Sequence, residues 1–253
     1  MNGTIEFKHK NYQINLAEAI DISIPLRDGL VNPNCFYAPP VSFEPLKAGD
    51  FVGAVSAGAP VNFFNVRLNP HGNGTHTECV GHIAKEPYTI NQCLTQFAFP
   101  ARLMTVYPQR VANGDRIVQL TEDLMQIGVD TPALVLRTMP NTMDKQSRQY
   151  SGTNPPYLEP RLLAWLVDQG VDHLLLDLPS VDREQDEGVL AGHHAFWTYP
   201  TAPRTQATIT EMVYIPDAIK DGLYLLHFQI AAFELDVSPS KPVLYQMYSM
   251  KVD

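Results

Sequence analysis

The chain has 253 residues, of which 45% are hydrophobic and 18% are charged, and this composition suits one domain over residues 1–253 with a substantial core. The net charge is −9 and the 18 lysines and arginines are scattered singly, so nucleic-acid binding is not expected. No apolar run approaches the ~20 residues that span a bilayer, and the start lacks the apolar core of a signal peptide. The three cysteines contain no C-x-x-C pair, which suits a reducing cytoplasm.

Predicted strands outnumber predicted helices along the chain, which 21 prolines and 15 glycines divide into short segments. Alternating or short apolar runs predict a hairpin at 4–16 and strands at 20–26, 60–68, 101–108, 132–138, 172–179 and 221–235, the last as one long strand or a strand pair. Helical spacing over 159–170, ended by Gly170, predicts a helix. The long polar stretch 139–158 is typical of a lid or binding loop. We therefore expect an α/β fold with a mixed sheet and more strand than helix.

Residues 71–82 read HGNGTHTECVGH and contain three of the chain's eight histidines. In a strand, His76 and Glu78 would lie on one face about 6–7 Å apart, and His82 has the same parity. A turn of two glycines and one asparagine could return His71 to them. Neutral imidazole and carboxylate are ligands for Zn²⁺, Mn²⁺ or Fe²⁺. The alternative is a polar loop whose histidines are only solvated.

A second group of candidate ligands lies downstream. Asp177 and Asp182 flank a Pro-Ser turn, and two adjacent histidines follow at 193–194. Glu211 is an acid within an otherwise apolar, strand-like stretch, where a ligand and an exposed strand position explain it about equally well. Taken alone, the acidic run 182–187 indicates a solvated loop.

These residues resemble the metal-dependent cyclase family, which includes bacterial kynurenine formamidases and isatin hydrolases and has the signature H-x-G-T-H-x-D-x-P-x-H. The chain has G-T-H at 74–76, an acid at Glu78 and a histidine at His82. Other family segments occur in the same order between residues 20 and 245, and they read IDISIPL, ALVLRT, LLLDLPSVD, GHH and SPSKPV. The resemblance therefore covers most of the chain.

The resemblance implies a swivelling β/β/α single domain, a homodimer or homotetramer, and a site for one or two divalent ions, zinc or manganese. The implied metal ligands come from the first motif, the histidine pair and the late glutamate, and they are His71, His76, Glu78, His82, His193 and Glu211. His193 is preferred to His194 because it is the first histidine of the matching element.

Four departures place the chain in a divergent branch of that family. His71 lies one residue before the position of the family's first histidine, so either His71 or Asn73 fills the first ligand position. Glu78 replaces the usual aspartate and Val80 replaces a proline. The stretch after the histidine pair is longer than usual, and we expect this insert, 195–210, to arch over the pocket.

The favoured chemistry is hydrolysis of an amide, formamide or lactam bond in a small molecule, as in arylformamidases. A divalent ion would lower the pKa of a bound water from about 15.7 toward ~7 and polarise the scissile carbonyl. His82 or Glu78 would then carry a proton to the leaving amine. Five side chains could form an apolar wall for an aromatic or cyclic amide, with ordinary core packing as the alternative for each: Phe36, Tyr37, Phe63, Phe64 and Trp197.

Two other classes of protein are the alternatives. A cupin-type metal isomerase or dioxygenase also uses histidines and a glutamate, but its H-x-H motif differs from the H-T-E found here, and the Asp-x-Pro-Ser-x-Asp turn has no counterpart in it. The second alternative is a protein of the same fold that binds a small ligand without catalysis. Metal content and turnover of amides would separate an enzyme from it.

Overall fold

Three apolar runs that were predicted as strands form the middle of a nine-stranded mixed sheet. They are parallel neighbours, and their bounds are β9 (Ala98–Val106), β12 (Ala133–Thr138) and β14 (His173–Leu176). Every residue of β12 and β14 is buried, as expected for parallel strands that are covered on both faces. The structure is a computed structural model, and it describes residues 1–250.

Shorter strands complete this sheet on both sides. Their bounds are β3 (Ile20–Asp21), β8 (His76–Cys79), β15 (Thr208–Glu211), β16 (Gly222–His227), β17 (Val237–Pro239) and β18 (Val243–Gln246). The strand order is β17-β8-β15-β14-β12-β9-β16-β18-β3. β15 runs parallel to β14, whereas the other five outer pairings are antiparallel. The predicted α/β fold with a mixed sheet and more strand than helix is confirmed.

Helices cover both faces of the sheet. Leu134 and Leu136 of β12 point into a core shared with α3 (Pro160–Asp168) and α4 (Ala191–Trp197), whereas Val135 points into a second core that includes residues of α1 (Ile90–Cys93). The helix predicted at 159–170 is confirmed as α3. The remaining helices are α2 (Glu122–Ile127), η1 (Val55–Ala57), η2 (Val80–His82) and η3 (Met143–Gln146). None of the helices in residues 1–250 is long and apolar enough to cross a membrane.

Two smaller sheets pack beside the main one. The hairpin predicted at 4–16 is confirmed, and its two strands are joined by a third strand from the end of the chain. The strands of this sheet are β1 (Asn2–Phe7), β2 (Lys10–Asn15) and β19 (Tyr248–Ser249). The other sheet contains β10 (Gln109–Arg110), β11 (Arg116–Val118) and β13 (Tyr157–Leu158).

Two predicted strands are shorter than their apolar patterns. The strand at 20–26 ends at Asp21, because the Asp21 carboxylate accepts the backbone N–H of Ser23 and turns the chain. The strand at 221–235 ends at His227, after which the chain crosses to β17 at the opposite edge of the sheet. Hydrophobicity continues through this crossing but burial does not, since Leu235 is exposed.

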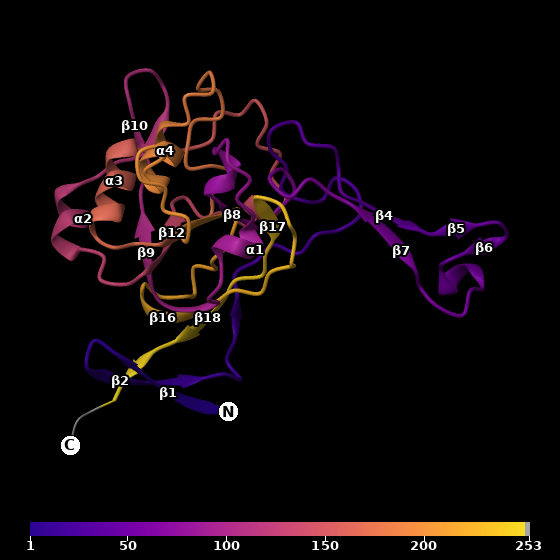
Figure 1. Cartoon of the computed structure of the whole chain (residues 1–253), viewed down its shortest axis with the longest axis horizontal. Helices are drawn as coiled ribbons and strands as arrows, with labels where there is room; N and C mark the ends of the chain where they lie inside the picture. The colour runs from indigo at the N-terminus through magenta and orange to yellow at the C-terminus, as the bar shows by residue number, and fades with distance from the viewer. Residues whose placement is uncertain (251–253) are drawn as a thin grey trace.

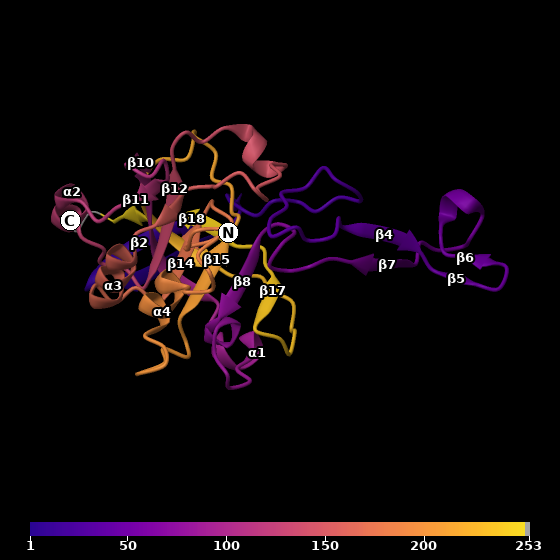
Figure 2. The ribbon, with the colours of Figure 1, turned by 90° about the horizontal axis from the view of Figure 1, so that it is seen from above.

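Residues 42–67 form an arm that extends away from the main sheet (Figures 1 and 2). Its base is a two-stranded ribbon of β4 (Ser42–Pro45) and β7 (Phe64–Arg67), and its tip carries β5 (Lys47–Ala48) and β6 (Phe51–Val52). All four residues of β7 are exposed, on both of its faces. The strand predicted at 60–68 therefore exists but lies outside the core.

The polar stretch 139–158 is fastened to the end of the sheet by a buried lysine. The Lys145 ammonium lies 2.7 Å from Asp177 Oδ2, directly after β14, and donates to the backbone carbonyl of Thr138 at 2.7 Å. Tyr150 of the same stretch is also buried. These contacts hold the middle of the stretch in place next to the turn that follows β14.

From the burial of the central strands we predict how far a cavity in the middle of the sheet lowers the free energy of unfolding. Leu174 of β14 is fully buried, so Leu174→Ala should lower the free energy of unfolding by about 2–5 kcal/mol. Leu30→Ala, at an exposed position, should change it by less than about 0.5 kcal/mol. Chemical denaturation of the two variants checks this, and equal effects would contradict the assignment of this core.

Candidate metal centre

Strand β8 carries two of the candidate ligands into the interior. It lies between β15 and β17, and all four of its residues are buried. His76 pairs with Glu211 of β15, and Glu78 follows two residues along on the same face. Thr77 points to the opposite face, where its hydroxyl contacts those of Thr210 and Ser240 at 2.8 Å each. The pleat of this strand therefore separates a face of potential metal ligands from a face of ordinary hydroxyl pairs.

Glu78 lies at the centre of the cluster. Its Oε1 is 3.3 Å from His193 Nε2, and its Oε2 is 3.1 Å from His71 Nδ1 and 3.7 Å from His82 Nδ1. Its side chain is only 1% exposed. Burial acts to raise the pKa of Glu78, but the imidazoles of His82, His193 and His71 outweigh it and hold the pKa well below its usual value. The carboxylate is therefore ionised.

His76 and Glu211 face each other across the two strands. His76 Nδ1 lies 2.9 Å from the backbone carbonyl of Gly74, which can only accept, so this nitrogen carries the proton. The lone pair of Nε2 then points toward Glu211 Oε2, 3.4 Å away, and this buried nitrogen has no hydrogen-bond partner. Glu211 Oε1 is already occupied by the backbone N–H of Val181 at 3.0 Å. Two acceptors that face each other in the interior require a cation or a proton between them.

His193 repeats this arrangement from the other side. Its Nδ1 lies 2.6 Å from Asp182 Oδ2, and the Asp182 carboxylate also accepts the backbone N–H groups of Gly192 and His193 at the start of α4. Nε2 is thereby left to face Glu78 Oε1, an atom without a hydrogen-bond partner. Burial alone would lower the pKa of His193, but Asp182 and Glu78 raise it to about 10. The neighbouring His194 points to the carbonyl of Tyr199 instead and does not reach the centre.

The glycine turn brings His71 back to the cluster despite its early position. Gly74 has a φ of 100°, a backbone conformation that favours glycine. The His71 and His76 ring centroids lie 5.5 Å apart. Asn73 points elsewhere, since its side chain accepts the backbone N–H of Asn69 and donates to the carbonyl of Pro39. Of the two candidates for this position, His71 is the one that reaches Glu78.

His82 reaches the cluster from a 3₁₀ turn and not from the strand that its parity suggested. Strand β8 ends at Cys79, and η2 then swings the imidazole to the rim, where its side chain is 28% exposed. Its ring centroid lies 4.3 Å from that of His71 and 5.3 Å from that of His193. His82 is therefore the most solvent-accessible of the six candidate ligands.

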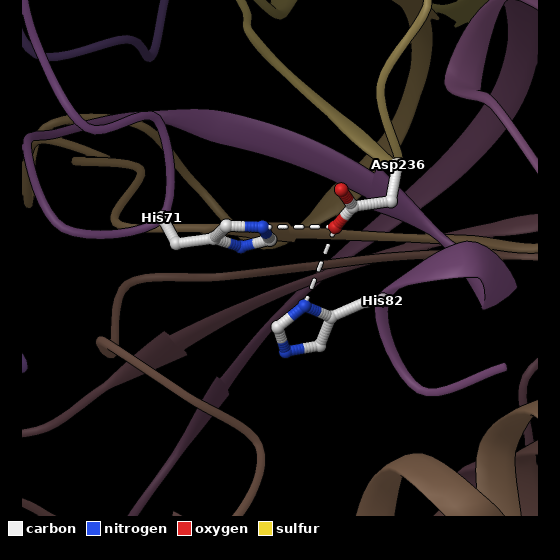
Figure 3. Close-up of side chains that lie close together, drawn as sticks. All are labelled: His71, His82 and Asp236. Carbon is white, nitrogen blue, oxygen red and sulfur yellow. Dashed lines mark hydrogen bonds and ion pairs between the residues drawn. The ribbon is translucent and has the colours of Figure 1, made fainter. Parts of the chain in front are cut away.

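Asp236 joins the site and was missed in the sequence. It precedes β17, and one of its oxygens, Oδ2, lies 2.9 Å from His71 Nε2 and 3.4 Å from His82 Nδ1 (Figure 3). These two imidazoles hold the pKa of Asp236 below its usual value. The available signal was an acid two residues before the Ser-Pro segment at 238–239, at the end of a long apolar run.

Three residues of the predicted apolar wall lie in different parts of the fold. Trp197 is fully buried, its N–H donates to the carbonyl of Ala207 at 2.9 Å, and its ring lies 5.5 Å from that of His193. The insert at 195–210, which was expected to arch over a pocket, therefore begins in this core with Trp197 packed inside it. Phe63 and Phe64 lie on the arm, at 57% and 44% exposure. Core packing is thus the correct reading for Trp197.

The residues present fit a divalent cation. Three groups of side chains have ligand atoms that all lie within 4.8 Å of one another, and they are His71, His76 and Glu78, then Glu78, His82 and His193, and at the rim His71, His82 and Asp236. Two atoms bonded at about 2.0–2.2 Å to one tetrahedral zinc ion are about 3.4 Å apart. The facing pairs at 3.3 and 3.4 Å have this separation. An ion would also supply the positive charge that the two unpartnered buried atoms lack.

Comparison with known proteins shows the family and the fold of this chain. The Cyclase family model, described as "Putative cyclase", matches residues 20–183. The kynurenine formamidase of Bordetella petrii is 26% identical over 220 residues, which are 83% of this chain and 96% of that protein. An isatin hydrolase bound to the product analogue thioisatinate has a TM-score of 0.62 at 16% identity, covering 90% of this chain and 92% of the other. Isatin hydrolase A from Ralstonia solanacearum has a TM-score of 0.65 at 12% identity, with coverages of 90% and 91%. The structural similarities show a shared fold.

Two adjacent histidines provide a matched pair for testing the centre. His193→Ala removes the ring that faces Glu78, so it should weaken binding of Zn²⁺ or Mn²⁺ by about 10-fold or more. His194→Ala removes a ring that faces Tyr199 and should leave binding unchanged. Metal analysis and chelator competition on both variants check this. Equal affinities for the two variants would show that His193 holds no ion.

Proposed function

This chain belongs to the cyclase family, and we propose on that basis that it is a metal-dependent hydrolase of an amide, formamide or lactam bond in a small molecule. The observation that carries the proposal is the pair of facing acceptors His76 Nε2 and Glu211 Oε2, together with the buried Oε1 of Glu78, which has no hydrogen-bond partner. The names of the relatives, kynurenine formamidase and isatin hydrolase, support the reaction class.

Five of the candidate ligands would hold one or two ions of zinc or manganese, and these are His71, His76, Glu78, His193 and Glu211. The two oxygens of Glu78 face different imidazoles, so this carboxylate lies between two groups of nitrogen ligands. Asp182 fixes the tautomer of His193 and turns Nε2 inward, as carboxylates do for metal-binding histidines. A divalent ion bound there would polarise the scissile carbonyl and lower the pKa of water.

His82 is the residue that we assign to proton transfer. Its Nδ1 faces the carboxylates of Glu78 and Asp236, which leaves Nε2 free at the half-exposed rim. A neutral ring with its proton on Nδ1 can accept a proton at Nε2 from water and return it to a leaving amine. Glu78 is a poorer carrier because it is fully buried and held by three imidazoles. In this proposal the five ligands bind the ion and His82 moves the proton.

The loop beside His71 supports an aromatic or cyclic substrate. The N–H of Cys35 donates to the carbonyl of Gly72, which ties this loop to the turn that positions His71. Phe36 and Tyr37 follow, both exposed and both at a φ of 54°, a strained conformation for aromatic residues. Such strain is typical of binding loops held by their surroundings.

The fold argues against the cupin-type enzyme, but it does not separate the hydrolase from a non-catalytic binding protein. A cupin is a barrel of antiparallel strands, whereas the middle of this sheet is parallel, so the cupin reading is not supported. A non-catalytic binding protein of the same fold would hold the same cluster without turnover. Activity measurements decide between that protein and the hydrolase.

We also propose that the protein assembles as a homodimer or homotetramer through its arm. A two-stranded ribbon is marginal by itself in water, and both strands of this one leave backbone groups unpaired. The arm also exposes Val61, Phe63, Phe64 and Val66. Cover by a second copy would remove this apolar surface from water.

Turnover of small amides tests the proposed reaction. The purified protein should hydrolyse at least one of N-formylkynurenine, isatin and simple cyclic amides, and chelation should abolish the activity until Zn²⁺ or Mn²⁺ is restored. His82→Ala should lower kcat by about 10²–10⁴-fold while metal content is kept. His194→Ala is the control and should behave like the unaltered protein. Metal binding without turnover of any compound would favour the non-catalytic alternative.

Light scattering tests the proposed role of the arm. The double variant Phe63→Ser/Phe64→Ser removes two exposed aromatic rings and should shift the mass from an oligomer to a monomer. Phe97→Ser changes an aromatic residue of similar exposure outside the arm and should keep the original mass. An unchanged oligomer in the arm variant would exclude these two residues from the contact.

A further inference from the structure

Asp236 is held at the edge of the metal centre by its backbone. Its carbonyl accepts the N–H of Cys79, the residue after Glu78, and the preceding carbonyl of Leu235 accepts the N–H of Ile90. The carboxylate thus projects from a fixed point beside β8, with its side chain 29% exposed. The crossing segment that ends at Asp236 is anchored where it passes the cluster.

A single carboxylate oxygen of Asp236 contacts two imidazoles. Figure 3 shows His71 and His82 directed at this oxygen from different segments, with the second nitrogen of His82 pointing away from it. The distances from Oδ2 are 2.9 Å to His71 Nε2 and 3.4 Å to His82 Nδ1. Because a carboxylate can only accept, His71 Nε2 donates its proton to it, whereas His82 Nδ1 faces it at the distance of an ion pair.

The contact with Asp236 determines what the other nitrogen of His71 can do. A neutral ring has one donor and one acceptor nitrogen, so donation from Nε2 leaves a lone pair on Nδ1. That lone pair faces Glu78 Oε2 at 3.1 Å. His193 has the same relation to the other oxygen of Glu78, with Asp182 in the outer position. The cluster therefore has two similar halves, each with an outer carboxylate, an imidazole and a shared inner carboxylate.

We propose that Asp236 is a positioning residue that serves two histidines of different function, an inference that rests on the proposed hydrolase. It holds His71 with Nδ1 free to bind a metal ion, and it holds His82 with Nε2 free to carry a proton. It also stabilises the position of His71, which comes one residue early on the glycine turn. Outer carboxylates of this kind orient the ring and increase its strength as a ligand.

Zinc affinity of the metal-stripped full-length chain tests this inference. Asp236→Asn keeps the size of the side chain but removes its charge, and Asp236→Ala removes the acceptor altogether. Both substitutions should raise the dissociation constant for Zn²⁺ by about 10–100-fold. The constant is measured by competition with a chromophoric chelator. The number of ions bound per chain at saturation should stay the same, because Asp236 acts through His71.

Glu234→Gln is the matched control, since Glu234 lies two residues earlier and its carboxylate contacts Thr89 and Asn91 outside the centre. Its zinc affinity should equal that of the unaltered chain. An Asp236→Asn variant within twofold of the unaltered chain would overturn the inference while leaving the metal centre intact. Loss of one ion per chain at saturation would also overturn it, because Asp236 would then be a ligand itself. An unaltered chain that binds no zinc would refute the metal centre and this inference together.

Discussion

The buried negative charge of Glu78 is the constraint around which the site is arranged. Removing an ionised carboxylate from water costs on the order of several kcal/mol unless nearby groups compensate it. Here the compensating groups are imidazoles, which come from the turn before β8, the turn after it and the start of α4. Imidazoles can stabilise this charge as protonated rings or as ligands of a shared cation. The same arrangement thus accounts for the raised pKa values of His71 and His193 and for the fit to a metal ion.

The register of three strands gathers the cluster from distant parts of the sequence. β8 pairs with β15 on one side, which sets His76 opposite Glu211. It pairs with β17 on the other side, which sets Val237 opposite Glu78 and places Asp236 at the rim. The turn after β14 then supplies Asp182 for His193. Backbone hydrogen bonds of the sheet, rather than loops alone, therefore fix most of the distances in the centre.

Much of this arrangement could be predicted from the sequence, because apolar runs and ligand spacing are local signals. The buried strands β12 and β14, the helix α3 and the close approach of His76 to Glu78 belong to this part. The role of Asp236 could not be predicted, since its partner His71 lies 165 residues earlier in the chain and no short motif joins them. The arm could not be predicted either, because the sequence pattern of β7 resembles that of a core strand and burial depends on the whole fold. For Trp197 the sequence left core packing and a substrate contact both open, and burial of the ring in the fold decides for core packing.

An inserted or deleted residue has different effects in the turn before His76 and in strand β8, which begins at His76. One residue added or removed within the glycine turn alters the path of the backbone, and the extra residue here is absorbed while His71 still reaches Glu78. One residue added between His76 and Glu78 would instead move one of them to the opposite face of the sheet, among Thr210 and Ser240. A change of one residue before His76 is therefore compatible with the site, whereas a change in the two-residue step from His76 to the carboxylate is not.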